Sequence, residues 1–230
     1  MHEAWKAAAD RFALVSLVQH VALYVVAAVF FARGRSMERI VDWCLAAAFA
    51  TSAAALLATP GARAGGALAA ALAALWARDA RRPVNRFYLA ATPRPRLVLM
   101  AVLAAYGAMY PGYAEGLPAV FFSPYGVLLQ PTLLVALATA NSGERTDRVL
   151  HWALAATGLS WGIVGAAAEG LLRNVPLLVT SAYAVPIALG VGGRRTPPDG
   201  DGQSMRAIRD RMYGRWTLLP GPKKPRYGRR

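Results

Sequence analysis

The chain has 230 residues, of which 56% are hydrophobic and 17% charged, and its mean hydropathy is +0.34. A soluble domain of 24.5 kDa has too small an interior to bury the apolar residues that fill positions 12–193. The formal net charge of +14 suits nucleic acid, but the chain has no nucleic-acid-binding motif. We therefore expect a multi-pass membrane protein whose partner is the lipid bilayer, and no nucleic acid.

The apolar residues form seven segments, which we expect to be helices because an open sheet edge cannot satisfy its backbone groups in lipid. The third segment is short and rich in Ala and Gly, and the seventh contains Pro186. The fold class predicted is an all-α bundle of about seven transmembrane helices. The segments cover residues 12–31, 40–58, 64–77, 97–110, 118–140, 149–172 and 175–191.

The first segment is preceded by a short charged stretch and followed by Arg33 and Arg35. A run of this length that ends in arginines favours a retained spanning helix over a cleaved signal peptide. The single cysteine, Cys44, excludes an internal disulfide and any CxxC site. It lies in an apolar segment, so we expect a buried structural thiol.

Basic residues alternate between the connections. The connections after segments one, three and five are rich in arginine, whereas the others carry only Arg63, Glu115 and Arg173. The positive-inside rule then places the N-terminus outside and the C-terminus in the cytoplasm, which requires an odd number of spans. We expect a bacterial inner membrane. The arginines are Arg33, Arg35, Arg39, Arg78, Arg81, Arg82, Arg86, Arg94, Arg96, Arg145 and Arg148.

The chain divides into a transmembrane bundle, residues 1–193, and a basic cytoplasmic tail, residues 194–230. In the tail, apolar residues recur at spacings of three and four between arginines, which is typical of an amphipathic helix on anionic lipids. A disordered solubilising tail is the alternative. The apolar positions are Met205, Ile208, Met212, Trp216 and Leu219.

One histidine, His20, lies near the middle of the first segment. Ser16, His20 and Tyr24 recur at steps of four and so share one helix face. Ionisable residues within a membrane are expensive, and they mark functional sites by default. The plainer interpretation is a neutral histidine that is hydrogen-bonded to another helix; the other is a proton relay or a ligand contact.

The sixth segment has a face of small residues with an ionisable residue at each end. Such glycine faces are usually helix-packing surfaces, although a ligand can also approach them closely. Glu169 is either solvated or paired with Arg173, four residues later, or it contributes to a site. The residues of this face are His151, Gly158, Gly162, Gly165 and Glu169.

The fifth segment contains Pro124 and Pro131, each of which removes a backbone donor. Helices broken within the membrane often form binding sites in transporters. We therefore predict an outward-opening polar pocket. Its predicted ligand-binding residues are His20, Gln130, Tyr125 and Glu169.

Several cofactor sites are excluded by the sequence. All three lysines lie outside the segments, so no retinal Schiff base can form. The histidines His20 and His151 lie at different depths, which argues against a bis-histidine haem. No HExxH, GxSxG or P-loop motif occurs. We expect no cofactor and no metal site.

The pair Tyr110-Pro111, the turn that begins at Phe121, and Pro131-Thr132 with the aliphatic run after it carry a resemblance. Together with the sixth segment, which is rich in Trp and Gly, they resemble an uncharacterised family of small bacterial polytopic inner-membrane proteins. The resemblance covers roughly the second half of the chain and implies no substrate.

The leading function predicted is the binding or passage of a small solute through the polar pocket. The alternative is a non-catalytic subunit that packs in a larger membrane complex or a homo-oligomer. A lipid-modifying enzyme is the third. His20 and Glu169 would then be its acid and base, but no nucleophile accompanies them. Whether the protein is an enzyme stays open, and the sequence favours that it is not.

Overall fold

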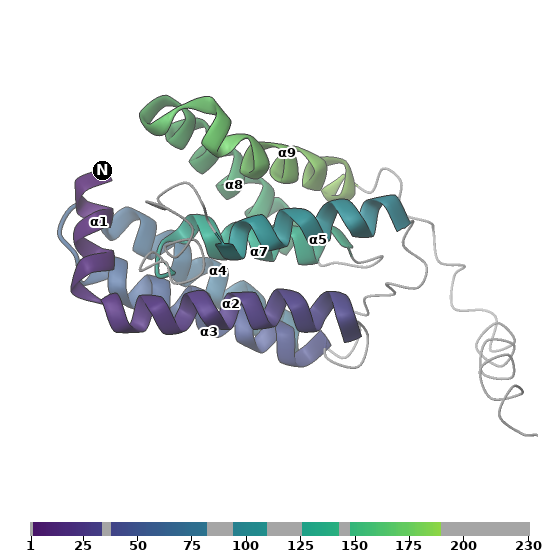
Figure 1. Cartoon of the computed structure of the whole chain (residues 1–230), viewed down its shortest axis with the longest axis horizontal. Helices are drawn as coiled ribbons and strands as arrows, with labels where there is room; N and C mark the ends of the chain where they lie inside the picture. The colour runs from purple at the N-terminus through teal and green to yellow at the C-terminus, as the bar shows by residue number, and fades with distance from the viewer. Residues whose placement is uncertain (1, 34–37, 82–93, 110–125, 143–147, 190–230) are drawn as a thin grey trace, which may run out of the picture. The chain divides into compact units, whose positions relative to one another are not determined.

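The computed structural model describes residues 2–33, 38–81, 94–109, 126–142 and 148–189, and within them the protein is all-α (Figure 1). Apolar runs long enough to satisfy their own backbone groups explain why these segments are helical. The helices are α1 (His2–Arg11), α2 (Ala13–Arg33), α3 (Glu38–Leu57), α4 (Arg63–Arg81), α5 (Arg94–Met109), α7 (Leu129–Ser142), α8 (Arg148–Glu169) and α9 (Leu171–Ala188).

Each of the seven predicted segments overlaps a helix, and α1 is a helix that the hydropathy pattern did not predict. The boundary between the last two segments was wrong. Helix α8 ends at Glu169 and α9 begins at Leu171, so Gly170 alone forms the turn. Gly170 has a φ of 97°, a backbone conformation that glycine adopts without a steric penalty. Glu169, Gly170, Arg173 and Asn174 all interrupt the apolar run here, so hydropathy alone does not place the turn at Gly170.

Four helices, not the predicted seven, are long and apolar enough to cross a membrane within the described residues: Ala13–Ala32, Arg39–Leu57, Arg148–Ala168 and Leu171–Ala188. Helices α5 and α7 have 16 and 14 residues. At 1.5 Å per residue they reach about 24 and 21 Å, short of the ~30 Å hydrocarbon core. Helix α4 has 19 residues, but it carries three arginines and Asp79, and its apolar residues are mostly alanine.

Contacts between the helices fix their directions. The start of α2 bonds to the second half of α3 and to the start of α7, and Gln130 near the start of α7 meets Asn174 near the start of α9. We call this end, where α2, α7 and α9 begin, the amino end. Trp43 and Arg81 join the start of α3 to the end of α4, and Arg96 joins the start of α5 to the end of α7. We call this opposite end, where α3, α5 and α8 begin, the arginine end.

Helix α7 is buried along its whole length, Leu129–Ser142. It packs against α2, α3, α5, α8 and α9, and Figure 1 shows it between α2 and α9. A helix enclosed in this way need not match the thickness of the bilayer, because its neighbours, and not lipid, surround it. This explains how a 14-residue helix fits within the bundle.

Large apolar side chains are exposed on the outer faces of α2, α5, α8 and α9. Val18 on α2 is 62% exposed, Val102 on α5 60% and Ile163 on α8 62%. Apolar faces of this extent on long apolar helices are what a lipid bilayer covers. The protein is therefore a helical, multi-pass membrane protein.

The sequence predicted that Pro131 breaks a membrane helix, and the structure shows no break at this residue. It is the third residue of α7, in the first turn, where backbone N–H groups have no partner within the helix and proline is tolerated. Pro124 lies outside the described residues, as do the first part of the predicted fifth segment and the whole tail from residue 194. The predicted amphipathic helix of the tail stays a prediction.

A buried polar cluster at the start of α7

The structure places two of the four predicted site residues in its interior. His20 on α2 is fully buried, and Gln130, the second residue of α7, is 2% exposed. Glu169 is the last residue of α8, and its side chain lies outside the described part of the chain. Tyr125, which immediately precedes Gly126, also lies outside it. The four-residue pocket therefore stays a prediction, and the description that follows is built from His20, Gln130 and their neighbours.

Gln19, the residue before His20, joins three helices. Its Nε2 atom shares two N–H donors among three acceptors: the Ala48 carbonyl oxygen at 3.1 Å, Ser52 Oγ at 2.9 Å and Thr132 Oγ1 at 3.2 Å. Because a carbonyl oxygen can only accept, the contact with Ala48 fixes which end of the amide is the nitrogen. Gln19 thereby links α2 to α3 and α7 within the amino half of the bundle.

The chain entering α7 lies directly against α2. Ser16 Oγ accepts a hydrogen bond from the Val127 backbone N–H at 3.0 Å. A Cβ on Gly126 would lie 2.1 Å from the Ser16 carbonyl oxygen and 2.6 Å from the His20 backbone nitrogen. Only glycine permits so close an approach of two backbones.

On its other side the start of α7 meets α9. Gln130 Nε2 donates to Asn174 Oδ1 at 3.3 Å, and Asn174 Nδ2 donates to the Gly170 carbonyl oxygen at 3.2 Å. Asn174 is 2% exposed. The polar residues of α2, α3, α7 and α9 thus form one set, which we call the α7-start cluster: Ser16, Gln19, His20, Ser52, Gln130, Thr132 and Asn174.

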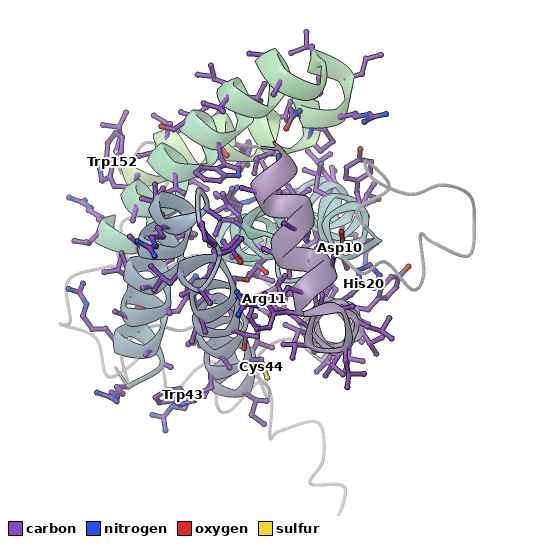
Figure 2. All side chains as sticks on the ribbon, turned by 90° about the vertical axis from the view of Figure 1, so that its left-hand side faces the viewer. Asp10, Arg11, His20, Trp43, Cys44 and Trp152 are labelled. Carbon is purple, nitrogen blue, oxygen red and sulfur yellow. The ribbon has the colours of Figure 1, made fainter. Side chains whose placement is uncertain are left out.

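Figure 2 views the molecule from the amino end, with α1 in front, and labels His20 on α2. The His20 ring lies 6.3 Å from the Tyr24 ring, at an angle of 60° between the planes. The predicted common face of Ser16, His20 and Tyr24 is therefore present, and it turns its first two members to the interior. The choice between a structural histidine and a ligand contact stays a prediction.

One acceptor of the cluster is unsatisfied. Gln19 Oε1 is buried and has no hydrogen-bond partner among the described residues. Leaving such a group unpaired costs about 1–3 kcal/mol. A donor from a guest molecule, a water or a group beyond the described residues would remove that cost.

The glycine face of α8 packs against α9. A Cβ on Gly158 would lie 2.1 Å from Ser181 Oγ, one on Gly162 2.6 Å from Leu178 Cδ2, and one on Gly165 2.3 Å from Asn174 Oδ1. The helix-packing interpretation of this face accounts for all three glycines. Gly165 also leaves the room in which Asn174 reaches the cluster.

A second polar group lies at the arginine end. Arg96 donates through Nε to the Asn141 carbonyl oxygen at 2.7 Å and through a second nitrogen to the same oxygen. Its guanidinium lies 5.5 Å from the centre of the Tyr183 ring, and Asn141 Nδ2 donates to the Thr180 carbonyl oxygen at 2.9 Å. Arg96 thus supplies a positive charge to the C-terminus of α7, where the helix dipole is negative.

Other chemistry finds little support in the described residues. No group of three His, Cys, Asp or Glu side chains among them is placed to hold a metal ion. The buried acids Asp42 and Asp79 and the buried His151 belong to the arginine half, away from the α7-start cluster. The cluster itself is made of amides, hydroxyls and one imidazole, groups that bind and orient a neutral solute.

The chain matches no family model, no curated protein and no solved structure. The resemblance stated from the sequence therefore stays a prediction.

Proposed function

We propose that this protein binds, and by opening passes, a small polar solute at the α7-start cluster. The observation that carries the proposal is Gln19. Its side chain is 5% exposed, and its amide nitrogen is shared among acceptors on two neighbouring helices. Its amide oxygen has no hydrogen-bond partner in the described residues. Polar groups are costly within a membrane bundle and are retained there chiefly for function.

The cluster is closed in this structure, since His20 is fully buried and Gln130 is 2% exposed. A solute enters only if the bundle opens at its amino end. Helix α1 covers that end, because its Ala9 packs with Val127 and Ala55 and its Arg11 bonds to the Ala58 carbonyl oxygen. We propose that movement of α1 and the start of α7 uncovers the cluster.

The same proposal places the amino end outside and the arginine end in the cytoplasm of a bacterial inner membrane. The described arginines support this orientation, because Arg39, Arg78, Arg81, Arg94 and Arg148 are exposed at the arginine end. The α7-start cluster then lies in the outer half of the membrane, and the pocket opens outward.

The two other functions gain less from the structure. A subunit of a larger complex was suggested by the small-residue face of α8, but α9 uses that face within the chain. A lipid-modifying enzyme needs a nucleophile that donates its proton to a base, whereas the bonds of Ser16 and Ser52 in the α7-start cluster are accepted from the Val127 backbone N–H and from Gln19 Nε2.

Cysteine accessibility tests the proposal. In a Cys44→Ser background, Ser52→Cys places a thiol of nearly the same shape within the cluster, where the serine is fully buried. We expect a small, water-soluble, membrane-impermeant thiosulfonate reagent to label Ser52→Cys in intact cells, because opening admits water to the cluster. Ser181→Cys is the matched control: Ser181 is equally buried but lies against Gly158, outside the cluster, and stays unlabelled. Equal protection of both thiols would show that the cluster does not open.

A further inference from the structure

Three arginines in the described residues lie over aromatic rings, and two of them have a structural task. Arg11 lies over Phe12 and donates to the Ala58 carbonyl oxygen, one residue beyond the end of α3. Arg96 lies over Tyr183 and donates to the Asn141 carbonyl oxygen near the end of α7. Both satisfy backbone acceptors that a helix leaves open at its C-terminus.

Arg81 is the exception. Its guanidinium carbon lies 5.7 Å from the centre of the Trp43 ring, but no acceptor among the described residues takes a hydrogen bond from it. Arg81 is exposed and Trp43 is 44% exposed. A guanidinium held over a ring by a cation–π contact still presents its N–H donors in its own plane, where they can form two parallel bonds to an oxyanion.

The position of the pair indicates which oxyanion. Trp43 lies one turn inside the candidate span Arg39–Leu57, and Figure 2 shows it at the edge of the molecule, away from the interior. Tryptophan at this depth is typical of the boundary between acyl chains and headgroups. Arg81 ends α4 beside it, so its charge lies at the level of the lipid phosphates.

We propose that Trp43 and Arg81 form a binding site for an anionic phospholipid. The guanidinium of Arg81 binds the phosphate oxygens through two N–H donors, while the ring of Trp43 restrains the guanidinium by the cation–π contact and packs against the glycerol and upper acyl carbons. Charge complementarity favours an anionic lipid over a zwitterionic one, since the exposed Arg39 and Arg78 belong to the same end of α3 and α4. This site is independent of the α7-start cluster and of the proposed function.

The test uses the full chain in detergent with added phosphatidylglycerol or phosphatidylcholine, and native mass spectrometry measures how much of each lipid stays bound. We expect the wild-type protein to prefer phosphatidylglycerol. Arg81→Gln should weaken its binding about fivefold, the value of one basic residue at a membrane surface. Arg81→Lys should bind phosphatidylglycerol more weakly than the wild type and more strongly than Arg81→Gln, because it keeps the charge but loses the planar, bidentate donors. Trp43→Leu should also weaken binding.

Arg148→Gln is the matched control, because Arg148 is exposed at the same end, begins α8 and has no cation–π contact with a ring in the part of the chain that the structure describes. It removes the same charge and should leave phosphatidylglycerol binding within twofold of wild type. The proposal is overturned if Arg81→Gln binds phosphatidylglycerol as the wild type does, if Arg148→Gln loses as much, or if both lipids are lost equally. Thermal unfolding of each variant, measured on the same samples, identifies any loss of binding that follows from a loss of fold. If Arg81→Gln does not fold, the phosphatidylglycerol binding of Arg81→Lys tests the proposal in its place.

Discussion

At the scale of the residue, glycines show where backbone meets backbone and where it meets a side chain. A Cβ at Gly126 meets the Ser16 carbonyl oxygen and the His20 nitrogen, neither of which can move without moving α2. A Cβ at Gly162 meets the far end of the Leu178 side chain, which can turn aside. We expect Gly126→Ala to lower the free energy of unfolding by about 3 kcal/mol and Gly162→Ala by about 1 kcal/mol.

Unfolding of both variants in detergent, followed by circular dichroism, checks this order. Equal losses would mean that the entry to α7 yields as readily as a leucine side chain, and that the contact between α2 and α7 is loose.

His20 and Gln130 were predicted because they interrupt apolar runs, and both are buried. Gln19 interrupts the same run, directly beside His20, but it was not predicted because only ionisable residues counted as candidates in this segment. Asn174 was missed for another reason. The predicted boundary left it in a connection between two segments, whereas the turn at Gly170 makes Asn174 the fourth residue of α9, in the first turn of that helix. Which polar residues meet depends on helix rotation and register, and neither is fixed by hydropathy.

At the scale of the element, Arg96 decides how α7 ends. It donates to the Asn141 carbonyl oxygen and so satisfies an acceptor in the last turn of a helix that is buried from end to end. We expect Arg96→Gln to lower the free energy of unfolding by about 2 kcal/mol, because a charged hydrogen bond and a favourable interaction with the helix dipole are both lost. Arg94→Gln removes an exposed charge from α5, the helix that also carries Arg96, and should change the free energy of unfolding by less than about 0.5 kcal/mol.

Detergent unfolding curves of the two variants give the comparison. A variant Arg96→Gln as stable as Arg94→Gln would show that the end of α7 draws its stability from other contacts.

The helices could be predicted from the sequence where a long apolar run alone determines them. The segments that became α2, α3, α8 and α9 match their helices within a few residues. Helix α7 was predicted as a broken transmembrane helix because hydropathy cannot distinguish a helix covered by lipid from one covered by its neighbours. Because its neighbours enclose it, α7 can be short, and its first turn accommodates Pro131 without a break. Helix α1 was missed because it is too polar to register as a membrane segment.

At the scale of the whole molecule, the directions of the helices constrain how the chain crosses the bundle. Helices α3 and α8 both end at the amino end, since Ser52 meets the start of α2 and Gly165 meets the start of α9. The chain must therefore return to the arginine end between them, and α4, α5 and α7 provide that return. The helix ends that flank the predicted arginine-rich connections then lie at one end, and the orientation of the chain in a membrane stays a prediction.

This arrangement makes a prediction about sidedness. Arg63 at the start of α4 and Arg148 at the start of α8 are both exposed, and they lie at opposite ends. In a Cys44→Ser background, we expect a membrane-impermeant maleimide to label Arg63→Cys in intact cells and Arg148→Cys only after the membrane is permeabilised, because the positive-inside rule holds the arginine end in the cytoplasm. Labelling of Arg148→Cys in intact cells would reverse the orientation, and it would turn the α7-start cluster toward the cytoplasm.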